Sequence, residues 1–212
     1  MLTKKERPCE IQTLFPSMPL VAILRGVRPE EVVDIGEALY RAGLRFIEVP
    51  LNSPEPYQSI ARLNEALGDR CVCGAGTVVN ADQVDAVAET GATLVVAPNT
   101  DAAVIGRALE LGLTVMPGVA TATEVFQAYR LGARYLKLFP ASSYGVGHVK
   151  ALKSVMPEDA RLLAVGGVGA VNAREWFSAG IDGLGVGKEL FTPGFDAEKV
   201  YRNAIELVAA VS

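Results

Sequence analysis

Eight short apolar runs recur along the whole chain and alternate with amphipathic, alanine-rich segments. Their spacing is roughly 20 to 26 residues, the length of one strand, one helix and two tight loops. The predicted strands are Leu20–Arg25, Phe46–Leu51, Cys71–Ala75, Leu94–Pro98, Thr114–Pro117, Tyr135–Phe139, Leu162–Val165 and Gly183–Val186. The repeat therefore predicts eight copies of one strand-helix unit, with no linker between them.

Glycines follow several of the predicted helices, where a left-handed C-terminal cap is typical. They are Gly43, Gly91, Gly112, Gly132 and Gly180. Eight buried parallel strands, each followed by a helix, predict an α/β fold, a (β/α)8 TIM barrel that spans residues 1–212 as one domain. A doubly wound open sheet has the same periodicity and stays open as an alternative. The extra segment Cys9–Phe15 is expected to form a short helix that closes the bottom of the barrel.

The composition restricts the partners. The chain has 212 residues, is 50% hydrophobic and 21% charged, and carries a formal charge of -4. Because its lysines and arginines are scattered singly, we expect no nucleic-acid surface. The positively charged N-terminus is not followed by an apolar stretch long enough for a signal peptide or a membrane span. We therefore expect a cytoplasmic protein with no membrane partner.

The cysteines and the histidine do not form a metal-binding pattern. Cys9, Cys71 and Cys73 are an odd number, and the pair Cys71 and Cys73 lies within a predicted strand and not at a zinc-site spacing. We expect reduced thiols in a reducing compartment. His148 is the single histidine, which excludes a site of several histidines. We expect neither a metal ion nor a cofactor.

Two charged residues interrupt apolar runs. Lys137 lies in the middle of the strand Tyr135–Phe139, and Glu48 lies in the strand Phe46–Leu51. Burial disfavours the charged form of an amine, so a lysine in this setting can be neutral and nucleophilic near neutral pH. The alternative is that Lys137 faces solvent from an edge strand. Two opposite charges, each within its own apolar strand, favour a buried pair or a nucleophile with its acid/base partner.

A barrel of this kind places its active site at the C-terminal ends of the strands. The residues there are Arg25-Gly26, Gly74-Ala75-Gly76-Thr77, Pro98-Asn99, Pro117-Gly118, Gly166-Gly167 and Gly185-Val186-Gly187-Lys188. Glycines after the seventh and eighth strands predict a phosphate site, because backbone N–H groups approach an anion closely only where no Cβ intervenes. Each signal also has an ordinary interpretation: glycines in tight turns, Arg25 at the surface, and Thr77 or Asn80 as a helix N-cap.

The chain resembles the 2-keto-3-deoxy-6-phosphosugar-acid aldolases, a family of class I (Schiff-base) aldolases, from about residue 20 to residue 190. The resemblance rests on seven motifs in order: Ala22-Ile23-Leu24-Arg25-Gly26, Glu48-Val49-Pro50-Leu51-Asn52-Ser53-Pro54, Gly74-Ala75-Gly76-Thr77-Val78, Pro98-Asn99, Met116-Pro117-Gly118, Leu136-Lys137-Leu138-Phe139-Pro140 and Ala164-Val165-Gly166-Gly167-Val168. The motif that contains Asn52 resembles the branch that acts on 2-dehydro-3-deoxy-6-phosphogalactonate. The branch that acts on the gluconate epimer would be expected to carry arginine there.

The resemblance implies a role for each residue. Lys137 would attack the C2 ketone of a phosphorylated keto acid, with Glu48 as general acid/base. Arg25 and Thr77 would hold the carboxylate, and pyruvate and D-glyceraldehyde 3-phosphate would be the products. The phosphate would be bound by Gly166, Gly167 and Gly187, with Lys188 standing where the family commonly has a serine. The pocket wall would comprise Pro98, Pro117, Phe139 and Asn52.

The resemblance also implies a homotrimer. Three other functions are weighed against the galactonate aldolase. The first is a gluconate aldolase, with or without activity on 4-hydroxy-2-oxoglutarate. The second is a metal-dependent isomerase or epimerase, which the single histidine disfavours. The third is a non-catalytic phosphosugar-binding barrel, for which Lys137 would be dispensable.

Overall fold

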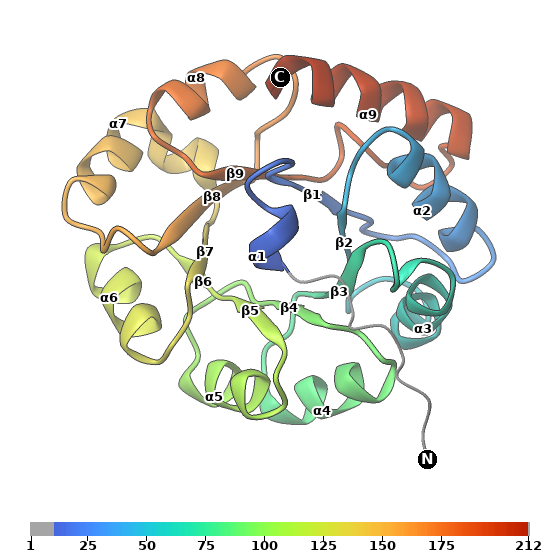
Figure 1. The fold of residues 1–212 in the computed structure, drawn as a ribbon, viewed down its shortest axis with the longest axis horizontal. Coiled ribbons are helices and arrows are strands. Elements are labelled where there is room, and N and C mark those ends of the chain that lie inside the picture. Colours follow the sequence, from blue (N-terminus) through green and yellow to red (C-terminus); the bar gives the residue numbers. More distant parts are fainter. Residues whose placement is uncertain (1–10, 212) are drawn as a thin grey trace.

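Parallel strands form a ring at the centre of the molecule, and helices surround it (Figure 1). The computed structural model describes residues 11–211. The strands are β1 (Leu20–Ile23), β2 (Phe46–Pro50), β3 (Val72–Gly76), β4 (Leu94–Val96), β5 (Thr114–Met116), β6 (Gly118–Val119), β7 (Tyr135–Leu138), β8 (Arg161–Val165) and β9 (Gly183–Val186). The helices are α1 (Ile11–Leu14), α2 (Val32–Arg41), α3 (Pro56–Leu67), α4 (Ala81–Glu89), α5 (Ala102–Glu110), α6 (Ala122–Arg130), α7 (Ala141–Lys153), α8 (Ala173–Ser178) and α9 (Ala197–Val211).

The strand order confirms the predicted barrel. Neighbouring strands run β5-β4-β3-β2-β1-β9-β8-β7-β6, and every pair is parallel. The first strand pairs with the last, which an open doubly wound sheet of this kind would not do. The predicted strand Thr114–Pro117 corresponds to β5, and β6 continues it beyond Pro117, which interrupts the ladder because proline has no N–H to donate. The ring thus corresponds to eight strand-helix units.

The helix ends follow the sequence signals. All five predicted glycines have positive φ, between 72° and 107°. At the opposite end of α4, Asn80 is the N-cap, and its side chain accepts a hydrogen bond of 2.9 Å from the backbone N–H of Gln83. The alternative role of Thr77 as this cap is therefore wrong.

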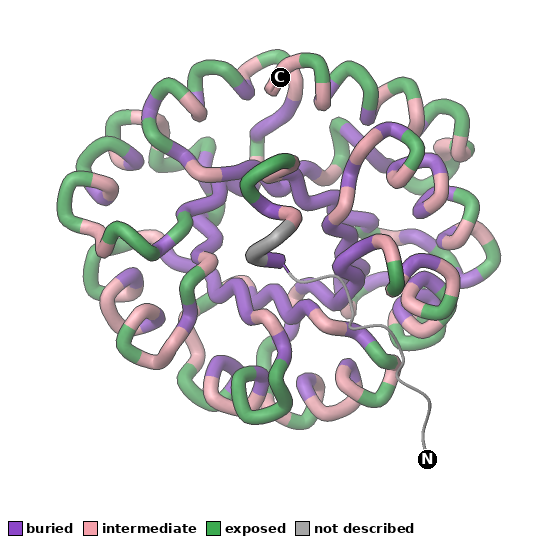
Figure 2. Tube along the Cα trace, viewed as in Figure 1, coloured by how far each residue is buried: buried purple, intermediate pink, exposed green. Residues whose placement is uncertain are grey.

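Alternate residues of each strand point into the barrel and fill its lower half with apolar side chains. This interior cluster contains Val21, Phe46, Val72, Leu94, Val96, Met116 and Leu163, together with Ile11 and Phe15. The residues between them face outward and pack against the helices in a second, larger core, so the strands are buried on both sides (Figure 2). Cys71 and Cys73 both belong to this outer core, as expected for side chains on one face, although β3 itself begins only at Val72. Cys9 lies outside the described residues.

The helix α1 lies within the ring at the N-terminal ends of the strands (Figure 1). The ring of Phe15, which follows it, packs edge-on against Phe46 and Tyr135 at centroid distances of 5.8 Å and 5.1 Å. Gly183 provides the space, since a Cβ there would lie 2.8 Å from Phe15 Cζ. The prediction of a short helix closing the barrel bottom is confirmed, and the open end is the C-terminal one. Within residues 11–211, no helix is long and apolar enough to cross a membrane.

Candidate active site

Lys137 lies in the interior of the barrel, at the third position of β7. The strand is flanked by β6 and β8, so the interpretation of Lys137 as a solvent-facing residue of an edge strand is wrong. Its backbone N–H donates to the carbonyl of Pro117 at 2.9 Å. The residue is only 6% exposed. Nζ lies 5.0 Å from the centre of the Phe139 ring, which covers it with apolar surface.

Glu48 faces the same interior from β2. It is 2% exposed, and its Oε2 atom has no hydrogen-bond partner among the described residues. Glu48 and Lys137 line one small void of about 10 Å³ in the barrel. Within the described chain, no ion pair of 4.0 Å or less joins the two. An unpartnered buried carboxylate is costly, and such groups are concentrated at functional sites.

Burial shifts both groups towards their neutral forms. Desolvation lowers the pKa of Lys137; the charge of Glu48 opposes this shift, and that of Arg25 adds to it. Desolvation also raises the pKa of Glu48, while the positive charges of Lys137 and Arg25 oppose that shift. The site thereby favours a neutral amine beside a carboxyl group whose raised pKa suits it to both giving and taking a proton.

Arg25 extends from the end of β1 over this pair and is held by two side chains. Its Nη1 donates to Asn52 Oδ1, and its Nη2 lies 3.5 Å from Thr77 Oγ1 as a long hydrogen bond. Ser53 fixes the loop that carries Arg25 by accepting a 2.9 Å hydrogen bond from the N–H of Gly26. Thr77 has φ of 60°, a left-handed conformation that costs a non-glycine residue about 1–3 kcal/mol. Such strain is concentrated at sites where a side chain must point in one direction.

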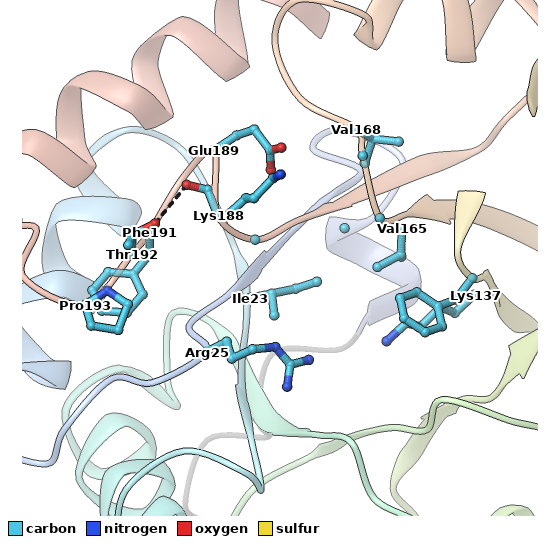
Figure 3. Close-up of a pocket in the computed structure, with 15 residues that line it drawn as sticks. Ile23, Arg25, Lys137, Val165, Val168, Lys188, Glu189, Phe191, Thr192 and Pro193 are labelled. Carbon is cyan, nitrogen blue, oxygen red and sulfur yellow. Dashed lines mark hydrogen bonds between the residues drawn. The ribbon is translucent and has the colours of Figure 1, made fainter. Parts of the chain in front are cut away.

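A cavity of about 410 Å³ opens above Lys137 at the C-terminal ends of β1, β7, β8 and β9. Its volume is within the range of small-molecule sites. The side chains of Arg25 and Lys137 point toward each other at one end, and Lys188 and Glu189 lie at the other (Figure 3). The apolar walls between them are lined by Ile23, Phe139, Val165, Val168, Phe191 and Pro193.

Glycines also line the cavity. Gly166 and Gly167 have φ of 95° and 73°. The carbonyl of Gly167 accepts a hydrogen bond of 2.9 Å from Asn172 Nδ2. In the described part of the chain, no protein acceptor is found for the N–H groups of Gly167 and Gly187. Backbone donors without a partner, next to the exposed Lys188, make this end of the cavity suited to an anion.

Comparisons with known proteins agree with this geometry. A family sequence profile described as "KDPG and KHG aldolase" matches residues 11–203. The chain belongs to this aldolase family. It is 46% identical over 193 residues to the 2-dehydro-3-deoxy-6-phosphogalactonate aldolase of Escherichia coli (strain K12), which covers 91% of this chain and 94% of the relative.

Two further members of the family are similar to this chain, one a solved structure and one a curated protein. A solved structure described as "Native KDPGal structure" superposes with a TM-score of 0.90 at 45% identity, covering 92% of this chain and 94% of the other. The 2-dehydro-3-deoxy-phosphogluconate aldolase of Pseudomonas aeruginosa is 31% identical over 175 residues, 82% of this chain and 79% of the relative. The galactonate relative is thus the more similar of the two curated proteins.

The predicted site residues of this family member fall into three groups. Those that line the cavity are Arg25, Lys137, Phe139, Gly166, Gly167, Gly187 and Lys188. Glu48 does not line this cavity but lines the small void in the barrel interior together with Lys137. Asn52 and Thr77 do not line the cavity either, and each accepts a hydrogen bond from Arg25, which does. Pro98 and Pro117, which were predicted to wall the pocket, lie outside its lining. The reason is that the cavity lies over β1, β7, β8 and β9, whereas these prolines follow β4 and β5.

Some residues that line the cavity were not predicted. Glu189, Phe191, Thr192 and Pro193 line the cavity from the loop after β9. This loop contacts the loop after β1, since a Cβ at Gly26 would lie 2.7 Å from Pro193 Cγ. Sequence spacing gives no signal for such a return of one loop onto another. For Ser53, the only signal was its place in the motif that contains Glu48 and Asn52.

Proposed function

We propose that the chain is a Schiff-base aldolase that cleaves 2-dehydro-3-deoxy-6-phospho-D-galactonate to pyruvate and D-glyceraldehyde 3-phosphate. The observation that carries the proposal is Lys137, a buried amine that lines a substrate-sized cavity with Glu48 in the same barrel interior. The family and the similarity to the galactonate aldolase of Escherichia coli support the substrate class.

In the first half of the reaction, the lone pair of Lys137 Nζ attacks the C2 carbonyl carbon and forms a carbinolamine. Loss of the C2 hydroxyl as water, with a proton from Glu48, gives an iminium ion. The positive nitrogen then accepts the electron pair of the C3–C4 bond. The first attack on C2 requires a neutral amine, and the lowered pKa of Lys137 favours that form.

In the second half, the proton of the C4 hydroxyl passes to the Glu48 carboxylate as the C3–C4 bond breaks. C4 becomes the aldehyde carbon of glyceraldehyde 3-phosphate, and C3 becomes the nucleophilic carbon of an enamine. Glu48 returns a proton to C3, and water then hydrolyses the pyruvate iminium and frees the amine. The same carboxyl group thereby gives and takes protons, for which a raised pKa is suited.

The two ends of the cavity match the two ends of the substrate. Arg25 would pair with the carboxylate near Lys137, with Thr77 and Asn52 holding its guanidinium. The phosphate would be bound at the opposite end by the N–H groups of Gly166, Gly167 and Gly187. The exposed Lys188 would add a positive charge there.

The pH dependence follows from the shift at Lys137. Only the neutral amine attacks, so cleavage should rise with pH as Lys137 loses its proton. Because burial lowers the pKa of Lys137, the rise should occur below the ordinary lysine value of about 10.4. We expect this limb in a profile of kcat/KM against pH. A profile that rises only at the ordinary lysine value would contradict the lowered pKa of Lys137, and a rate that does not rise with pH would contradict the neutral-amine mechanism.

The branch of the family is tested by comparing the two C4-epimeric substrates. Asn52, which accepts from Arg25, stands where the gluconate branch would be expected to carry arginine. We expect kcat/KM for the galactonate epimer to exceed that for the gluconate epimer by tenfold or more, which is about 1.4 kcal/mol in the transition state. Pyruvate release with no added metal measures both. A preference for gluconate would leave the mechanism and overturn the branch, and release from neither would favour a non-catalytic phosphosugar-binding barrel.

We also propose that the aldolase is a cytoplasmic homotrimer, as the resemblance to its family implies. Light scattering of the purified protein would report a mass three times that of the chain.

A further inference from the structure

The carboxylate of Glu48 occupies the space that a side chain at position 76 would take. An ideal Cβ built on Gly76 lies 1.2 Å from Glu48 Oε2, 2.3 Å from Cδ and 2.8 Å from Oε1. These three nearest atoms all belong to Glu48. The carboxyl group therefore lies directly against the backbone of β3 at Gly76, where no side chain intervenes.

The backbone of β3 is the fixed partner in this contact. Gly76 is the last residue of β3, where it pairs with Pro50, and its carbonyl accepts a 2.8 Å hydrogen bond from Leu51 N–H. Thr77, the next residue, holds its left-handed conformation beside Arg25. Glu48 is enclosed by the barrel, with 2% of its surface exposed. A methyl group at position 76 would thus displace the carboxylate and leave the strand in place.

We propose that Gly76 is a positioning residue, which sets the place of the Glu48 carboxylate in the barrel by lacking a side chain. The proposal rests on the proposed function only for its kinetic consequence, since the placement itself is a matter of packing. With the carboxylate displaced, proton transfer at C3 and at the C4 hydroxyl loses its geometry. Misplacement of a catalytic group by about 1 Å costs on the order of 10²-fold in rate.

The test is a double-mutant cycle on thermal unfolding. Gly76→Ala should lower the Tm by roughly 3–10 °C, as expected for overpacking in a domain of this size. In a Glu48→Ala background the same substitution should cost little, because the atoms it meets are gone. Equal losses of Tm in both backgrounds would overturn the proposal. If Gly76→Ala alone does not fold, folding of the double variant supports the proposal and its failure overturns it.

Gly74→Ala is the matched control, two residues earlier on the same face of β3. Its Cβ would lie 2.0 Å from the backbone oxygen of Leu94, and its three nearest atoms all belong to that residue. Truncation of Glu48 should therefore not rescue this variant. Rescue of both glycine variants alike would show a general loosening of the barrel and overturn the specific contact.

Kinetics separate this placement from the proposed chemistry. Gly76→Ala should lower kcat for cleavage on the order of 10²-fold, while borohydride in the presence of pyruvate still labels Lys137. An unchanged kcat, with Glu48→Ala impaired, would overturn the positioning role. If the unfolding cycle shows the coupling but Glu48→Ala cleaves at the normal rate, the placement stands and the proposed role of Glu48 fails.

Discussion

Replacement of Lys137 by methionine is expected to abolish cleavage, with a loss on the order of 10⁴-fold or more in kcat. The thioether chain fills the same volume but has no amine to form the iminium ion, and without it the C3–C4 electron pair has no acceptor. Lys137→Ala should lose activity to the same extent. Pyruvate release from the galactonate epimer measures both variants.

The methionine variant should lose activity without losing stability. Lys137 is 6% exposed, and burial of an amine among apolar side chains costs free energy that methionine does not. We therefore expect a Tm no lower than that of the natural chain, as found where function and stability oppose each other. Lys150→Ala, at an exposed position of α7, is the matched control and should cleave normally. Cleavage near the natural rate by Lys137→Met would remove the Schiff-base mechanism and favour the non-catalytic alternative.

Glu48→Gln is expected to lower kcat on the order of 10²-fold or more, since an amide of the same shape neither accepts nor gives a proton. Formation of the pyruvate iminium should be slower, because Glu48 also supplies a proton for that step, but should still be detected by labelling because Lys137 is intact. The charge of Glu48 is the one influence that raises the pKa of Lys137 against burial and Arg25, so its loss leaves the amine more readily neutral. In this variant, kcat for cleavage should therefore fall, while borohydride with pyruvate should still label Lys137.

The matched control for this variant is Glu65→Gln, at an exposed position of α3. It should retain both turnover and labelling. Loss of both in Glu48→Gln would mean that the iminium ion does not form without the Glu48 carboxyl group. Unchanged turnover would exclude it from the chemistry.

The fold was predictable because each of its determinants is local in the sequence. Spacing of the apolar runs gave the eight units, and the glycines after the helices gave their ends. The continuation of the fifth strand as β6 beyond Pro117 was not predicted, because the predicted strand ended at that proline. The short helix before β1 was predicted because it precedes the first unit of the repeat and has no strand of its own.

The site was predictable where a residue type conflicts with its surroundings. Lys137 and Glu48 are charges within apolar strands, and such conflicts mark functional positions. The contacts that depend on packing between distant loops left no such mark. Three such contacts join segments that only the closed barrel brings together. They are the hydrogen bond from Arg25 to Asn52, the contact of Pro193 with Gly26, and the contact of the Glu48 carboxylate with Gly76. Pro98 and Pro117 were placed in the pocket wall from the family resemblance, and neither that resemblance nor sequence periodicity says above which strands the cavity opens.

The central claim is that Lys137 forms a covalent iminium ion with the substrate, and reductive trapping tests it most directly. The protein is treated with sodium borohydride in the presence and absence of pyruvate, digested, and mapped by mass spectrometry. Hydride reduction of the iminium carbon would leave a stable carboxyethyl amine on the lysine. We expect this adduct on Lys137 alone, and only with pyruvate present. An adduct on another lysine, with Lys137 unmodified, or no adduct at all would contradict the account.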